Sequence, residues 1–68
     1  MKEKIGEAIE KHLEGHVALH KANIEIYLSN VVGIGDHPNV METIEKELEQ
    51  VSKYEGQLAV LRNLMRQN

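Results

Sequence analysis

The chain has 68 residues, no cysteine and a net charge of -3, which fits one small domain or one part of an oligomer. The missing cysteine excludes disulfides and thiolate zinc sites, and no apolar run approaches the ~20 residues that a membrane helix needs. Scattered basic residues and only two aromatic residues disfavour nucleic-acid binding. The charged start from Met1 to Lys4 argues against a signal peptide, so we expect a cytoplasmic protein.

Apolar residues at helical spacing predict a first helix over about residues 2–29. At ~100° per residue, one side of this helix carries Ile5, Ile9, Leu13, Val17, Ile24 and Leu28. The adjacent side carries Ala8, Leu19 and Ile26. This arc is wider than contact with one neighbouring helix requires, so we expect the first helix to contact a second copy of the chain as well.

Small residues recur every seven positions on the same helix, at Ala8, Gly15, Ala22 and Ser29. Such a column lets two backbones approach closely, which would explain a glycine that otherwise costs about 1 kcal/mol in a helix interior. The alternative is that the glycine is merely tolerated. We predict a dimer interface on this side of the helix, formed by Ile5, Ala8, Gly15, His16, Leu19, Ala22 and Ile26.

The segment of about residues 30–38 holds the only proline and a closely spaced glycine pair, and it predicts a turn. Asn30 and Gly33 are candidates for the residue that ends the first helix, and Asp36 and Asn39 are candidate caps of the next. A glycine-x-glycine run can also cradle phosphate. Here no strand precedes it, no lysine follows it and Asp36 would repel an anion, so the phosphate interpretation is disfavoured.

The turn contains Val32-Gly33-Ile34-Gly35, followed by an acidic residue, His37 and a proline, and then by a helix rich in isoleucine and glutamate. From Leu28 to about Leu61 the chain resembles a group of short uncharacterised proteins of tailed marine bacteriophages and related environmental sequences. It departs from their pattern at Asn30-Val31, where an Asn-Pro pair is expected. The resemblance implies an accessory phage or environmental protein, located in the host cytoplasm if phage-encoded. Because that group has no known activity, it supplies no catalytic residue.

Apolar residues at three- and four-residue steps predict a second helix over about residues 39–66. They are Met41, Ile44, Leu48, Val51, Tyr54, Leu58, Leu61 and Met65, with Val60 and Leu64 beside them. Two helices of similar length joined by one turn form an antiparallel hairpin. If residues whose numbers sum to about 67 lie level, Glu47 faces His20 and Glu55 faces His12.

Three histidines, His12, His16 and His20, stand four residues apart and form one row along the first helix. An i,i+4 histidine pair can hold zinc or another divalent ion, with Glu55 as a further candidate ligand. The Glu-x-x-His spacing of di-iron bundles is absent. The alternative is that the histidines form polar layers in a dimer interface, bonded to Glu47, to Glu55 or to one another. Axial haem ligation and a pH switch are further uses of such a row.

Together these features predict an all-α antiparallel helical hairpin that dimerises into a four-helix bundle. No arrangement of serine, histidine and acid indicates a nucleophile, so we predict neither an enzyme nor a cofactor. The predicted function is a homo-oligomeric structural or protein-interaction module, with a second copy or an unidentified protein as partner. The alternative is a metal-binding bundle built on His12, His16 and His20, with or without Glu55.

Overall fold

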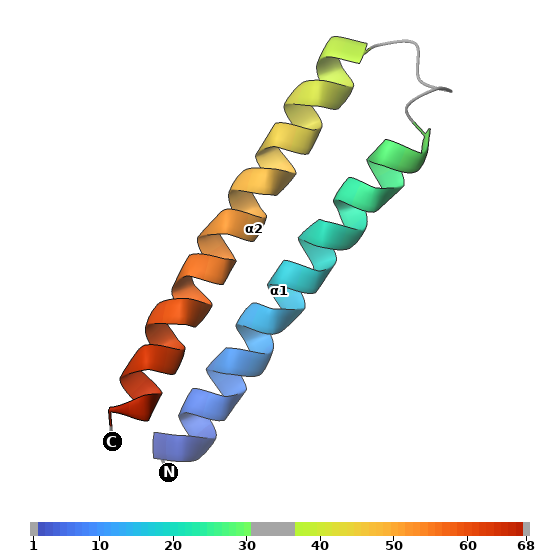
Figure 1. Ribbon diagram of the computed structural model, residues 1–68. Helices are drawn as coiled ribbons and strands as arrows, with labels where there is room; N and C mark the ends of the chain where they lie inside the picture. The colour runs from blue at the N-terminus through green and yellow to red at the C-terminus, as the bar shows by residue number, and fades with distance from the viewer. Residues whose placement is uncertain (1, 31–36, 68) are drawn as a thin grey trace.

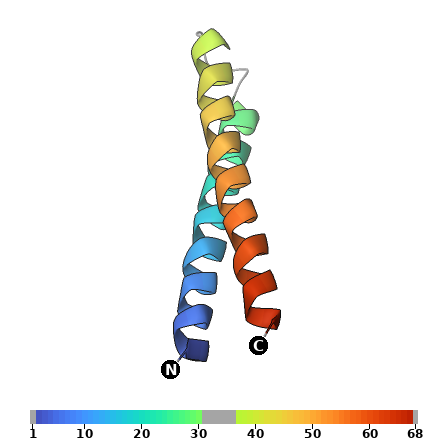
Figure 2. The ribbon, with the colours of Figure 1, turned by 90° about the vertical axis from the view of Figure 1, so that its left-hand side faces the viewer.

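Two long α-helices lie side by side in an antiparallel hairpin, which confirms the predicted all-α hairpin (Figure 1). The computed structural model describes residues 2–30 and 37–67, and only the backbone of residues 2, 30, 37 and 38. Helix α1 spans Lys2–Asn30 and helix α2 spans His37–Arg66. The side view shows that the helices cross at a shallow angle (Figure 2). The molecule is a rod of 51 × 14 × 11 Å.

The helix ends agree with the predicted boundaries to within two residues. Asn30 is the last residue of α1 and has no positive φ, while the candidates Gly33 and Asp36 lie outside the described residues. The prediction of Asn39 as a cap is wrong, because α2 already begins at His37 and Asn39 lies inside it. Helix α2 begins before Pro38, so the proline occupies its first turn, where its missing N–H breaks no helical hydrogen bond.

The core between the helices is thin. Among the described residues, the buried apolar side chains are Leu13, Val40, Val51 and Leu58. Less exposed residues recur in a heptad series on each helix, and we call these two series the inner seam. The series on α1 is Gly6, Glu10, Leu13, Val17, His20, Ile24 and Tyr27. The series on α2 is Val40, Ile44, Glu47, Val51, Tyr54, Leu58, Leu61 and Met65.

The predicted apolar stripes are wrong at several positions, because the inner seam includes polar residues. Glu47 holds the place expected for Leu48, and Val40 is buried where Met41 was expected. The displaced residues are 44–66% exposed: Ile5, Ile9, Leu28, Met41 and Leu48. The seam follows a strict heptad that carries charged side chains inward and turns these apolar ones towards solvent.

Candidate functional site

A polar layer interrupts the inner seam near the middle of the hairpin. Nδ1 of His20 lies 2.5 Å from Oε2 of Glu47, and Nδ2 of Asn23 donates to Oε1 of Glu47 at 3.2 Å. The His20 and Glu47 side chains are only 17% and 19% exposed. The prediction that Glu47 faces His20 across the hairpin is thus confirmed. The contact lies within one chain. Because both carboxylate oxygens are engaged, the layer fixes the register of α1 against α2.

His16 and His20 of the histidine row stack on Tyr54 of α2. The ring of His16 lies parallel to that of Tyr54, with centroids 4.3 Å apart and an interplanar angle of 8°. His20 lies at 5.9 Å from the same ring. Lys53 places its Nζ 5.0 Å from the Tyr54 centroid. The aromatic face therefore holds His16 in one orientation.

His12 and His16 contact one another at the edge of this stack. Their Nε2 atoms are 3.2 Å apart, and their rings meet edge to face with centroids at 4.5 Å. Burial, followed by the positive charges of His12, His20 and Lys53, lowers the pKa of His16. His16 is thus predominantly neutral at pH 7.

The four candidate metal ligands do not converge. His20 is held by Glu47, and Glu55 pairs with Lys21 at 3.3 Å instead of lying at His12 as predicted. Within residues 2–30 and 37–67, no group of three histidine, aspartate or glutamate side chains is placed to share one ion. Only His12 and His16 come together, as a pair.

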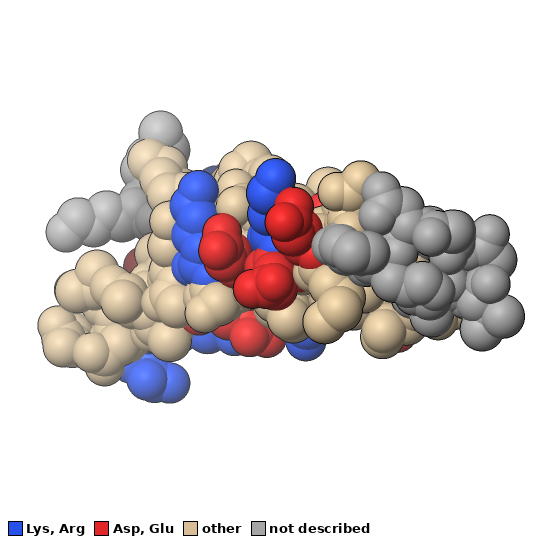
Figure 3. Space-filling model, turned by 90° about the horizontal axis from the view of Figure 1, so that it is seen from above, with Lys and Arg blue, Asp and Glu red and all other residues tan. Residues whose placement is uncertain are grey.

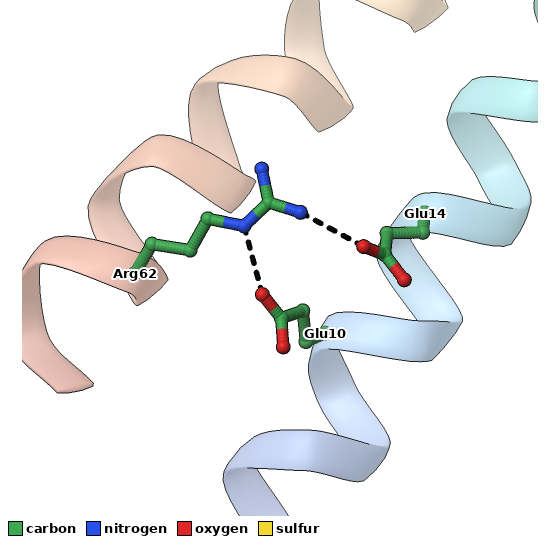
Figure 4. Close-up of polar contacts among 3 residues, drawn as sticks. All are labelled: Glu10, Glu14 and Arg62. Carbon is green, nitrogen blue, oxygen red and sulfur yellow. Dashed lines mark hydrogen bonds and ion pairs between the residues drawn. The ribbon is translucent and has the colours of Figure 1, made fainter.

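A second polar cluster, which the sequence interpretation missed, joins the helices towards their open ends. Arg62 donates from Nε to Oε2 of Glu10 and from Nη2 to Oε2 of Glu14, both at 2.8 Å (Figure 4). The hydrogen bond to Glu10 contributes most to the raised pKa of the Arg62 guanidinium. The sequence feature that could have predicted this cluster is the pair of glutamates four residues apart, because a single guanidinium can bridge them.

The predicted dimer interface lies on the surface of the hairpin, apart from His16, which is half-buried against Tyr54. Ile5, Leu19 and Ile26 are 53–59% exposed. A Cβ built on Gly15 would meet nothing within 4 Å, so Gly15 makes no close contact inside the chain. Gly6 is the glycine that lies close to the other helix. A Cβ built on Gly6 would lie 3.2 Å from Cε of Met65.

An apolar hollow of about 750 Å³ lies near the open end of the hairpin. Its lining includes Ile9, Leu13, Val60, Leu61 and Leu64. Seen from above, acidic and basic side chains lie next to one another between the two ends of the rod (Figure 3). Neither helix, over its described residues, is long and apolar enough to cross a membrane.

The side chain of Ser29, near the end of α1, forms a hydrogen bond within its own helix. Ser29 donates its hydroxyl to the backbone carbonyl of Glu25 at 2.8 Å, as Thr43 does to that of Asn39. Such bonds back to the preceding helical turn occupy the hydroxyl proton. Ser29 is therefore engaged by its own helix and not by a histidine.

Comparison with protein-family models, curated proteins and solved structures found no match to this chain.

Proposed function

We propose that the chain is a non-enzymatic structural module that pairs with a second copy through α1, giving a four-helix bundle. The observation that carries this proposal is the exposure of large apolar side chains. Nine of them, over the described residues, are 44–66% exposed, against four buried apolar side chains in the core. A surface of this kind is costly in water unless a partner covers it.

The exposed residues of α1 form a second heptad series, which we call the outer seam: Ile5, Ala8, His12, Gly15, Leu19, Ala22 and Ile26. All seven are exposed on the single hairpin. Larger side chains alternate with small ones along it, so knobs from one copy can enter the spaces beside Ala8, Gly15 and Ala22 of the other. At 1.5 Å per residue, this seam is about 32 Å long, enough for several turns of helix contact.

The thin core gives a second reason for pairing. Chains of this size rarely bury enough apolar surface alone, and this one has no disulfide to compensate. Covering the outer seam would add buried side chains without changing the hairpin. A module that assembles itself in this way needs no catalytic group.

Substitution of one outer-seam leucine tests the proposal. Leu19→Lys places a charge in the contact between copies, so the dimer should dissociate at concentrations where the original chain is paired. Leu28→Lys is the matched control, since Leu28 is also exposed on α1 but outside the outer seam. Sedimentation velocity reads the mass of each variant. Equal masses for the two variants would contradict pairing through this seam.

A further inference from the structure

We propose that His12 and His16 bind one divalent transition-metal ion, of the class of Ni²⁺, Cu²⁺ and Zn²⁺, through their Nε2 atoms. The two atoms lie 3.2 Å apart on the surface of α1. Both ligands belong to one chain, and because His12 is also part of the outer seam, the ion would lie at the contact between two paired copies.

The separation of the two nitrogens suits a shared ion. Metal–nitrogen bonds of about 2.0–2.1 Å at a tetrahedral angle put two ligand atoms about 3.4 Å apart. As a hydrogen bond between neutral rings, the 3.2 Å contact lies at the long limit of ordinary distances. An ion would replace this single contact with two coordinate bonds, both rings carrying their proton on Nδ1.

One ligand of the pair is already oriented. Stacking on Tyr54 at 4.3 Å holds the ring of His16, while the ring of His12, which is exposed on the single hairpin, can tilt towards the ion. His20 stays outside the site because its Nδ1 engages Glu47. No third histidine, aspartate or glutamate of the described residues joins the pair, so water fills the remaining positions. Imidazole ligands favour Ni²⁺, Cu²⁺ and Zn²⁺ over Mg²⁺.

One nearby charge acts against a bound ion. Lys53 places its ammonium 5.0 Å from the centre of the Tyr54 ring on which His16 stacks, and this charge repels a dication at the histidine pair. Replacing this lysine by a neutral residue should therefore tighten metal binding.

Calorimetric titration of the full chain with NiCl₂ at pH 7.5, and with MgCl₂ as control, tests the proposal. We expect one Ni²⁺ per chain, no Mg²⁺ binding, and affinity lowered about tenfold or more in His12→Gln. His20→Gln is the matched control and should bind within about twofold of the original chain, because glutamine keeps a hydrogen bond to Glu47. Lys53→Gln should bind more tightly than the original chain.

Unchanged Ni²⁺ affinity in His12→Gln would overturn the proposal, as would an equal loss in His20→Gln. A second readout needs no substitution: paramagnetic Ni²⁺ should broaden the imidazole proton resonances of His12 and His16 before those of His20 and His37. Broadening of His37 first would equally refute the site. Ni²⁺ should also raise the melting temperature of the original chain and not that of His12→Gln, since the pair is aligned only in the folded helix.

Discussion

The two long faces of α1 differ in where they place polar and apolar side chains. The inner seam, pressed against α2, contains Glu10 and His20, while the outer seam exposes Ile5, Leu19 and Ile26. The difference teaches that cross-helix bonds, and above all Glu47 held by His20 and Asn23, determine the rotation of this helix together with its apolar contacts.

The inner seam, with its polar layer, and the outer seam have distinct roles. Polar layers give a hairpin one register, because any slip would leave partly buried polar groups without partners. They contribute less stability than apolar layers would. The outer seam supplies the apolar surface that the hairpin itself leaves uncovered.

The largest effect should come from removing a buried apolar side chain of the inner seam. Leu58 is 5% exposed and Leu48 is 52% exposed. We expect Leu58→Ala to lower the free energy of unfolding by about 2–4 kcal/mol, and Leu48→Ala to change it by under about 1 kcal/mol. Urea unfolding at one fixed protein concentration measures both. Equal losses would show that the seam on α2 is placed wrongly.

Breaking the polar layer should come next. Glu47→Ala leaves His20 and Asn23 without their acceptor and should cost about 1–3 kcal/mol of unfolding free energy. Glu47→Gln retains one carbonyl acceptor and should cost less. The same urea experiment separates the two variants. A neutral outcome for Glu47→Ala would contradict a register fixed by this carboxylate.

Two glycines with open surroundings allow a comparison of the outer seam, which contains Gly15, with α2, where Gly56 lines the apolar hollow. A Cβ at Gly15 or at Gly56 meets nothing within 4 Å of its own chain. Gly56→Ala should therefore stabilise by about 0.5–1 kcal/mol, through helix propensity alone. Gly15→Ala should gain less, because its methyl group enters the contact with the second copy. Thermal melts at high protein concentration compare them, and an equal gain would place Gly15 in solvent.

The smallest effect concerns the protonation of His16. Its folded-state pKa lies below the unfolded value of 6.5, so between these values the unfolded chain binds more protons. This contribution to stability is present above about pH 6.5 and is lost as pH falls towards the folded pKa. His16→Phe retains stacking on Tyr54 and removes the titration, so its melting temperature should fall less between pH 7.5 and 5. Parallel pH profiles for the two chains would refute this assignment.

The hairpin and its helix boundaries could be predicted from the sequence because a proline, a glycine pair and helical periodicity are local signals. The pairing of His20 with Glu47 across the two helices could be predicted from the antiparallel geometry of the hairpin. The inner seam could not be predicted from apolar spacing, since Leu48 and Glu47 compete for one position and the competition depends on partners in α1. The stacking of His16 on Tyr54 was missed for the same reason, because a contact across helices depends on their rotation.

Pairing of two copies is tested most directly by measuring mass and helicity of the original chain across a dilution series. Sedimentation equilibrium should give twice the chain mass of 7.7 kDa at high concentration. Helicity by circular dichroism should fall together with the dimer on dilution, because the thin core of one hairpin is stabilised by the second copy. A fully helical monomer at low micromolar concentration would contradict this account of the outer seam.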